Sequence, residues 1–153
     1  MQNTINIKNK KAHFEYELMD KFTAGIVLAG TEIKAIREGR ASITESFCEF
    51  NDRNELFVIN MQIDEYSHAS HFNHKPKAER KLLLQKRELK KLSKEVKTSG
   101  LTIVPLRVFL NDRGLAKMQI ALAKGKKLYD KRDSIKDRDN MRDLARVKKN
   151  FNN

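Results

Sequence analysis

Residues 101–123 read LTIVPLRVFLNDRGLAKMQIALA, and this stretch carries the clearest signal of fold class in the chain. Two apolar runs flank the turn sequence NDRG, an arrangement that is typical of a β-hairpin. In the second run Met118, Ile120 and Leu122 alternate with polar residues, as on a strand with one buried face. Because Pro105 has no N–H to donate, it predicts a sheet edge or a bulge.

Strand-like runs also occur on the N-terminal side of this hairpin. Residues 13–18 alternate between apolar and polar side chains, and residues 26–29 form a short apolar run after Gly25. Residues 42–50 and 55–63 flank the polar turn NDRN. This second pair of runs predicts another hairpin.

Two segments have helical patterns. The sequence TEIKAIRE, with Thr31 as its N-cap, predicts a short helix. Residues 79–97 predict a longer amphipathic helix, because four apolar residues fall on one helical stripe: Leu82, Leu89, Leu92 and Val96.

Leu83 lies outside this stripe and has two interpretations. If the helix has already begun at this point, Leu83 is exposed among lysines, where it can contact an RNA base or ribose. If residues 81–84 are still extended, we expect Leu83 to be buried. The sequence leaves both interpretations open.

About six strands with two helices predict a mainly β fold, a six-stranded barrel of the oligonucleotide-binding (OB) type with flanking helices. An open α+β sandwich is the alternative. We expect three regions, namely a flexible leader at 1–12, an RNA-binding barrel at 13–123 and a basic tail at 124–153. Helix nucleation is costly and the tail has few apolar residues, so we expect it to be disordered when free.

Positive charge is concentrated in two parts of the chain, which holds 32 Lys and Arg against 20 Asp and Glu. Residues 1–74 are net negative, whereas residues 75–97 hold 10 basic and 3 acidic side chains and residues 124–153 hold 11 and 5. Such clustering predicts a polyanionic partner. We expect RNA and not an anionic membrane surface, because neither basic segment has the aromatic-rich apolar face that surface binding requires. No run is long and apolar enough to cross a bilayer.

The sequence offers little support for catalysis or for a metal. His68, His71 and His74 recur at intervals of three, but in a loop-like stretch without a zinc-site pattern. Cys48 falls on a strand face and is expected to be a small buried hydrophobe, and a single cysteine fits a reducing cytoplasm. No phosphate-binding loop or hydrolase motif is present. We expect no enzyme activity, no cofactor and no metal; a metal-dependent nuclease is the alternative from another class.

The segment GKKLYDKRDSIKDRD begins at Gly125 and interleaves cations with one aromatic residue, Tyr129. The cations can contact phosphates, and the ring supplies a stacking plane worth about 1–3 kcal/mol per base. The alternative is a linker in which Tyr129 packs on the barrel. The composition favours RNA contact, because a lone aromatic residue in a basic tail has little core to join.

Six segments along the chain resemble the small protein B family, the bacterial SsrA-binding proteins. They are AGIVLAGTEIKAIREGRASI at 24–43, INMQI at 59–63, FNHKP at 72–76, RKLLLQKREL at 80–89, GLTIVPL at 100–106 and ALAKGKKLYDKRDSIKDRD at 121–139. The resemblance implies a non-catalytic adaptor that binds the tRNA-like domain of transfer-messenger RNA. It also implies delivery, together with elongation factor Tu, to stalled ribosomes for trans-translation, in which the nascent peptide is tagged and the ribosome is released.

The resemblance also implies site residues. On the barrel it assigns RNA contacts to Lys21, Thr23, Lys34, Arg37, Lys81, Leu83 and Gln85. The family commonly has Glu at the position of Thr23, and His or Asn at that of Gln85. The tail is expected to enter the decoding centre and the empty messenger RNA channel and to become helical there, through Gly125, Lys126, Lys127, Tyr129, Asp130, Lys131, Arg132, Ile135, Lys136 and Arg138. We expect a cytoplasmic monomer, and a general RNA-binding barrel is the alternative function.

Overall fold

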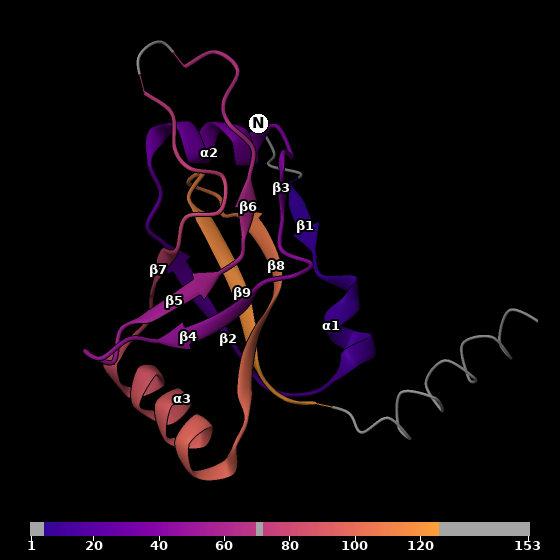
Figure 1. The fold of residues 1–153 in the computed structure, drawn as a ribbon, viewed down its shortest axis with the longest axis vertical. Coiled ribbons are helices and arrows are strands. Elements are labelled where there is room, and N and C mark those ends of the chain that lie inside the picture. Colours follow the sequence, from indigo (N-terminus) through magenta and orange to yellow (C-terminus); the bar gives the residue numbers. More distant parts are fainter. Residues whose placement is uncertain (1–4, 70–71, 126–153) are drawn as a thin grey trace, which may run out of the picture.

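The structure is a computed structural model that describes residues 5–69 and 72–125, and these residues form a closed β-barrel (Figure 1). Six antiparallel strands make its wall in the ring order β8-β4-β5-β7-β2-β9, and the pairing of β8 with β9 closes the ring. They are β2 (Tyr16–Ile26), β4 (Phe47–Phe50), β5 (Leu56–Ile59), β7 (Arg80–Leu83), β8 (Thr102–Leu110) and β9 (Ala116–Gly125). The predicted mainly β, OB-type six-stranded barrel is confirmed, and the open sandwich is not formed.

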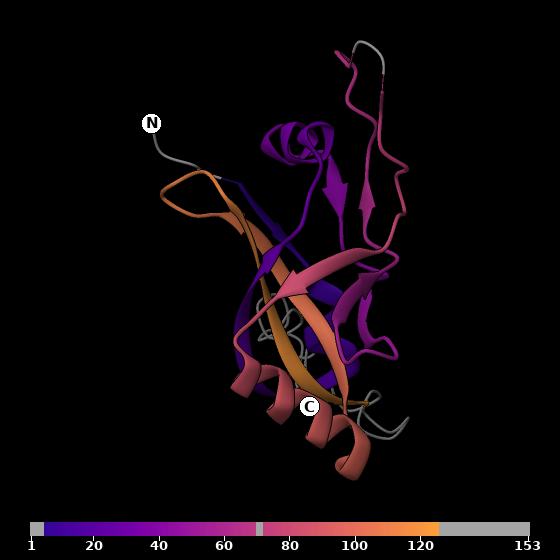
Figure 2. The ribbon, with the colours of Figure 1, turned by 90° about the vertical axis from the view of Figure 1, so that its left-hand side faces the viewer.

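Helices and short strands flank the barrel. The helices α2 (Gly30–Arg37) and α3 (Lys86–Ser99) lie at opposite ends of it (Figure 1 and Figure 2). The strand β1 (Asn6–Lys8) pairs with β8, and α1 (Lys10–Glu15) follows it. A two-stranded sheet of β3 (Ala41–Ser42) and β6 (Gln62–Ile63) lies next to α2. None of the helices in these residues is long and apolar enough to span a membrane.

The inward-facing side chains of the strands fill the interior of the barrel. On β9 these are Met118, Ile120 and Leu122, which are buried as the alternation in the sequence predicted. Ala24 of β2 and Val58 of β5 are buried with them. Each large apolar side chain removed from water stabilises the fold by about 1.5–3 kcal/mol. The interior is therefore the hydrophobic core, and the outward-facing residues remain for binding.

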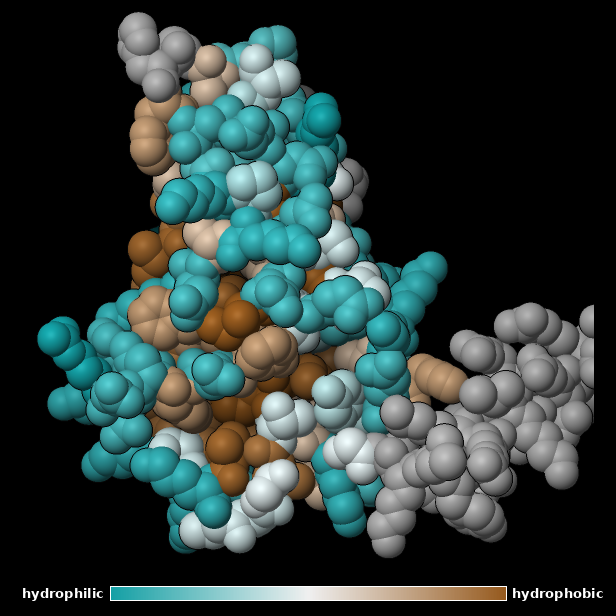
Figure 3. All heavy atoms as spheres, in the orientation of Figure 1, coloured by the Kyte–Doolittle hydropathy of each residue, from teal (hydrophilic) through white to brown (hydrophobic). Residues whose placement is uncertain are grey.

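The helix α3 closes one end of the barrel with the apolar stripe that the sequence predicted. Leu92 is fully buried, and Leu89 and Val96 pack against the core. Figure 3 shows apolar side chains gathered between this helix and β4, where Val96 and Phe50 line one groove. The helix ends at Gly100, whose φ of 66° is a left-handed conformation that glycine adopts without strain.

The long helix begins later than predicted, because residues 80–83 form the strand β7. Arg80 and Leu82 point into the barrel and are buried, which is a period of two and not of 3.6. The backbone of this strand pairs with β2 on one side and with β5 on the other. These tertiary hydrogen bonds outweigh the helical preference of a segment rich in leucine and lysine.

The N-terminal segment is more ordered than predicted, because residues 5–12, expected within a flexible leader at 1–12, include β1 and the start of α1. Asn9 is 3% exposed and caps α1, its Oδ1 accepting from the N–H of Ala12 at 3.3 Å. Its Nδ2 donates to the carbonyl of Pro105 at 2.9 Å. These bonds hold the segment against β8, a contact that its polar composition does not reveal.

Two strand ends also differ from the predictions. The strand β2 begins at Tyr16 and not at residue 13, and it runs through Gly25, so that residues 26–29 do not form a separate strand. The strand β9 continues two residues beyond the predicted end of the barrel, to Gly125. The start of β2 is later because residues 13–15 belong to α1. The pairing of β2 with β9 accounts for the other differences, since Gly25 lies opposite Lys117 and Gly125 lies opposite Tyr16.

The predicted hairpins are confirmed, with differences in detail. Phe50 pairs with Leu56 across the first turn, although this hairpin is split into the shorter strands β3 to β6. In the second hairpin the register shifts between Pro105 and Arg107, which is the predicted bulge. The short helix α2 is also confirmed.

The predicted cap of α2 is wrong. The helix begins after Ala29, whose N–H donates to Oε1 of Glu32 at 2.8 Å. The hydroxyl of Thr31 instead lies 2.9 Å from Nδ1 of His74. The carboxylate of Glu32 therefore stabilises the helix start, and Thr31 joins the helix to the loop that contains His74.

Candidate nucleic-acid interface

Strands β7, β2 and β9 lie side by side, and alternate residues of each face outward from the barrel. Leu83, Gly25 and Lys117 lie opposite one another in one row across these three strands. Thr23 and Gln119 are paired in the neighbouring row. We call these five residues the central face.

Leu83 is the exposed apolar residue of the central face, at 52% exposure. Its backbone is extended and not helical, so the prediction of an extended segment at residues 81–84 is confirmed. Its side chain is nevertheless exposed, which was expected only for a helix. Leu82 explains this combination, because it is buried and the next residue of a strand points to the opposite face. Leu83 therefore presents an apolar contact on the outer wall, in one row with Gly25 and Lys117.

Leu83 lines a groove of about 370 Å³ together with residues from α2 and from the β8–β9 turn. Leu115, which is 54% exposed, lines the same groove, as do the cations Arg37 and Lys117. Among the described residues no carboxylate lines it. A nucleotide suits such a groove, since its base has apolar faces and its phosphate is an anion.

Gly25 also lines this groove, between Leu83 and Lys117. A Cβ at this position would lie 3.5 Å from Cβ of Leu83 and 3.7 Å from Nζ of Lys117, which are ordinary contacts. The backbone of Gly25 does not adopt a positive φ. Neither packing nor conformation thus requires glycine here. A glycine inside a strand often marks a place where a ligand approaches the backbone closely.

Buried charged groups hold α2 against β7. Nε of Arg80 donates to Oε2 of Glu32, and both residues are at most 6% exposed. The remaining guanidinium nitrogens donate to three carbonyls, those of Met61 (2.7 Å), Lys75 (3.1 Å) and Pro76 (3.1 Å). These partners compensate the loss of hydration of the two charges. Because the pair fixes α2 relative to β7, it positions Arg37 beside Leu83.

Two predicted cations lie outside the groove. Lys81 faces outward from β7, and its Nζ lies 2.7 Å from Oε2 of Glu55. The hydrogen bond from Lys81, with a second from Asn51, lowers the pKa of Glu55. Nζ of Lys34 lies 5.6 Å from the ring centroid of Tyr66, so this lysine faces the loop after β6 and not the central face.

Lys21 and Gln85 flank the central face on either side. Lys21 is exposed on β2, two residues before Thr23. Gln85 is exposed at the start of α3, two residues after Leu83, and its Oε1 accepts from Nε of Arg87 at 3.0 Å. Of the seven predicted barrel residues, Arg37 and Leu83 line the same groove, and Thr23 lies on the central face with Leu83.

Of the predicted tail residues, the structure describes only Gly125. It is exposed at the end of β9 and pairs with Tyr16. The other predicted tail residues lie outside the described ones: Lys126, Lys127, Tyr129, Asp130, Lys131, Arg132, Ile135, Lys136 and Arg138.

The histidine cluster does not assemble in the described residues. His74 is buried, with Nδ1 near Thr31 and Nε2 2.9 Å from the carbonyl of Ile63. His68 packs edge-on against Tyr66, and His71 lies outside the described residues. In the two described ranges no three metal-ligating side chains come together. His74 therefore connects α2 and β6 and serves the fold.

Cys48 is 5% exposed and packs in the core, so the prediction of a small buried hydrophobe is confirmed. Burial raises the pKa of its thiol. A thiol of this kind remains protonated at neutral pH and is a poor nucleophile.

The sequence did not single out Leu115, Lys117 or Arg80. The outward orientation of Lys117 was readable from its alternation with Met118, but its position beside Leu83 depends on the pairing of β9 with β2. Leu115 directly follows the turn glycine, and no local pattern indicates that it faces α2. The helical pattern of residues 79–97 includes Arg80, and a helix there does not predict that this side chain points into the barrel.

Comparison of the sequence with known proteins identifies the family of this chain. A sequence model of the family described as SmpB protein matches residues 6–150. The chain belongs to the SmpB protein family. The SsrA-binding protein of Christiangramia forsetii is 71% identical, over 99% of this chain and 96% of the relative. The SsrA-binding protein of Flavobacterium psychrophilum is 64% identical, over 99% of this chain and 100% of the relative.

A solved structure resembles this SmpB-family chain over most of its length. It is described as "tmRNA-SmpB: a journey to the center of the bacterial ribosome" and is 40% identical, with a TM-score of 0.69. The alignment covers 86% of this chain and 95% of that chain. The resemblance to small protein B that the sequence motifs indicated is thus confirmed.

Proposed function

We propose that this chain is a non-catalytic RNA-binding adaptor, which binds the tRNA-like domain of transfer-messenger RNA and delivers it to stalled ribosomes. Its relatives are named SsrA-binding proteins, and its structural relative is described in connection with tmRNA and the bacterial ribosome. The observation on this chain that carries the proposal is the exposed apolar side chain of Leu83. It lines a groove together with Lys117, and no carboxylate of the described residues lines that groove.

In this proposal the groove binds one unpaired nucleotide of the RNA. Leu83 and Leu115 contact a base or ribose, and Gly25 leaves room for it beside the strand. Arg37 and Lys117 contact the neighbouring phosphates. Phosphate contacts supply affinity without reading sequence, whereas the apolar contact requires an unstacked nucleotide. The combination selects folded RNA with exposed loops over regular duplex.

The other predicted barrel residues surround this groove and extend the proposed interface: Lys21, Thr23, Lys34, Lys81 and Gln85. The tail, from Gly125 to Arg138, is proposed to enter the decoding centre and the messenger RNA channel, where trans-translation begins. Elongation factor Tu accompanies the complex in this proposal. The chain acts as a monomer in the cytoplasm, where the ribosomes are.

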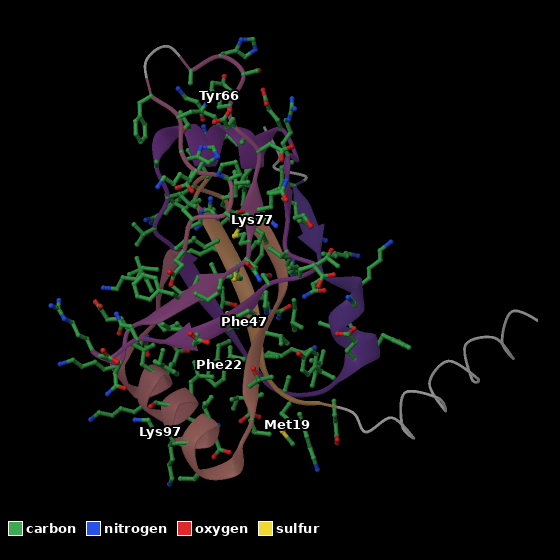
Figure 4. All side chains as sticks on the ribbon, in the orientation of Figure 1. Met19, Phe22, Phe47, Tyr66, Lys77 and Lys97 are labelled. Atoms are coloured by element: carbon green, nitrogen blue, oxygen red, sulfur yellow. The ribbon has the colours of Figure 1, made fainter. Side chains whose placement is uncertain are left out.

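The test compares Leu83→Ser with Met19→Ser. Met19 is also exposed, at 43%, and lies six residues before Gly25 on β2, about 20 Å away at ~3.3 Å per residue. Figure 4 labels Met19 at the end of the barrel near α3. Binding of a labelled tRNA-like fragment is measured by fluorescence anisotropy, with bulk tRNA as competitor. We expect Leu83→Ser to weaken binding about tenfold, the loss of roughly 1.4 kcal/mol, and Met19→Ser to bind like the unchanged chain.

The outcomes separate the proposal from its alternatives. Equal binding by Leu83→Ser and the unchanged chain would overturn the groove as the RNA site. An unchanged chain that prefers the tRNA-like fragment no more than bulk tRNA would indicate the general RNA-binding barrel. Degradation of the fragment in the presence of magnesium would revive the nuclease alternative, and we expect the RNA to remain intact.

A further inference from the structure

Four cations gather in a second groove, around β1 and the start of α1. Lys8, Lys10, Lys21 and Arg107 line one groove of about 200 Å³, together with Gln119. Lys8 and Arg107 lie directly opposite each other on the paired strands β1 and β8. We call these four cations the N-terminal basic patch.

Like charges on directly opposed residues of neighbouring strands destabilise a sheet. Carboxylates commonly relieve such repulsion, but three of those in the N-terminal half of the chain pair with other lysines. Glu15 and Glu45 pair with Lys11, and Asp20 pairs with Lys91. No described carboxylate lies within 4.0 Å of a cation of the N-terminal basic patch. The patch is thus an uncompensated positive surface, although residues 1–74 are net negative.

The fold orients the side chain of Arg107 and fixes the backbone that carries Lys8 and Lys10. Arg107 is oriented by two contacts, because Nη1 donates to Oδ1 of Asn6 at 3.3 Å and the guanidinium lies 4.2 Å from the ring centroid of Phe109. Lys8 and Lys10 flank Asn9, whose backbone N–H donates to the carbonyl of Leu106 at 2.8 Å. Ordered cations lose less conformational freedom on binding an anion than cations on a mobile chain.

The patch is continuous with the central face. Thr23, Gln119, Arg107 and Lys8 are paired in that order across β2, β9, β8 and β1. Adjacent strands are about 4.8 Å apart, so this row extends roughly 14 Å from Thr23 to Lys8. An RNA strand seated on the central face can therefore continue over the patch without leaving the protein surface.

We propose that the N-terminal basic patch binds the phosphate backbone of RNA, and that β1 and α1 thereby form a second part of the RNA interface. The inference rests on the proposed function and adds a phosphate-binding surface to it. The chemistry that recognises the ligand is shared by transfer-messenger RNA and ribosomal RNA, since both present phosphates at similar density.

The test replaces three cations of the patch together, in the triple variant Lys8→Gln, Lys21→Gln and Arg107→Gln. A matched control removes the same charge from α3, in Lys90→Gln, Lys94→Gln and Lys97→Gln, all of which are exposed. Figure 4 labels Lys97 on this helix. Binding is measured over a range of salt concentrations, once with the tRNA-like fragment and once with purified small ribosomal subunits.

We expect the patch variant to lose about two to three units of slope in log K against log salt, roughly one per phosphate contact. The α3 variant loses less than one unit. A reduced slope with the fragment alone, with the subunit alone, or with both supports the proposal and identifies the RNA that occupies the patch. Equal losses for the two variants, or no loss for the patch variant with either RNA, would overturn it.

A second measurement separates loss of binding from loss of folding. The patch variant must remain folded at the temperature of the binding assay. Lys8→Gln alone removes the like-charge contact and leaves the contacts of Arg107 with Asn6 and Phe109 in place, so its denaturation midpoint at low salt should equal or exceed that of the unchanged chain. A lower midpoint of Lys8→Gln would contradict the repulsion on which the inference depends. Failure of the proposed function looks different, since the unchanged chain would then show no preference for the fragment over bulk tRNA.

Discussion

Gly25 lies between Leu83 and Lys117 on the outer wall of the barrel. A Cβ atom added at this position would be in van der Waals contact with both side chains. A strand normally favours larger residues, since glycine adds backbone entropy to the unfolded chain and packs against nothing. The structure gives no conformational reason for glycine here. The residue is explained if an RNA nucleotide, and not a side chain, occupies the space beside it.

We therefore expect Gly25→Val to fold and to bind the tRNA-like fragment poorly. The added Cβ meets only ordinary contacts, so the free energy of unfolding should change by no more than about 1 kcal/mol. Affinity should fall about tenfold, because the isopropyl group occupies part of the groove. Gly30→Ala is the control, since a Cβ there has nothing within 4 Å. Unchanged affinity of Gly25→Val would show that the nucleotide lies elsewhere.

Cys48 gives a pH-dependent prediction at the same scale. Burial raises the pKa of its thiol above the ordinary value of 9.0, so the folded chain retains a proton that the unfolded chain loses above about pH 9. The free energy of unfolding should thus fall as pH rises beyond this value, and more steeply than in Cys48→Ala. At pH 8 iodoacetamide should label the folded chain roughly a thousandfold more slowly than the unfolded chain. Rapid labelling of the folded chain would contradict the burial.

Among the elements, β7 shows why the boundary of the long helix was not predictable from the sequence. The residues Leu82, Leu89, Leu92 and Val96 fit one helical stripe, and this pattern extends the helix back to residue 79. In the structure Leu82 belongs to the barrel and the other three belong to α3, so two unrelated packing surfaces produce one apparent stripe. Only pairing with β2 and β5 distinguishes them.

Arg80 is the buried, inward-facing charged residue of β7, and we expect its replacement to lower the free energy of unfolding strongly. In Arg80→Met, Glu32 remains buried without its partner, so we expect the free energy of unfolding to fall by about 3–5 kcal/mol. Lys81→Met is the control, because the adjacent pair with Glu55 is largely hydrated and contributes little. Urea denaturation measures both variants. If adding Glu32→Gln to Arg80→Met restores part of the lost free energy of unfolding, the cost arises from the unpaired carboxylate. Equal denaturation midpoints for all variants would contradict the coupling of α2 to β7.

The N-terminal elements show the opposite case, because the polar composition of residues 1–12 predicts flexibility whereas the structure contains β1 and the start of α1 there. The segment gains its order from the pairing of β1 with β8 and from the buried side chain of Asn9, which bonds both to α1 and to β8. Such bonds depend on a partner almost a hundred residues away in the chain. Residues 1–12 hold only one short apolar alternation, Ile5 and Ile7, which pack against the core but are too few to predict a strand.

At the scale of the whole molecule, the barrel and the tail are expected to separate two functions. The strand β9 ends at Gly125, where it pairs with the start of β2, so a chain ending after residue 125 retains every strand of the barrel. We expect this truncated chain to bind the tRNA-like fragment within about threefold of the full chain, because most of the phosphate contacts lie on the barrel. It should fail to support peptide tagging in a translation assay.

Loss of binding by the truncated chain, with its denaturation midpoint unchanged, would assign RNA recognition to the tail and contradict this division. Retention of tagging would contradict the role of the tail on the ribosome. The full chain carrying Met19→Ser is a control for the assay, since this residue lies outside the proposed interface.

The sequence by itself determined the strand-rich class, the two hairpins, the apolar face of α3 and the family. The physical reason is that alternation and helical stripes are local, and each states which face of a segment can be buried. Only the tertiary structure decided that Leu83, Gly25 and Lys117 form one row and that Lys8 faces Arg107. Strand order and register join segments far apart in the chain, so no local pattern encodes which exposed side chains become neighbours.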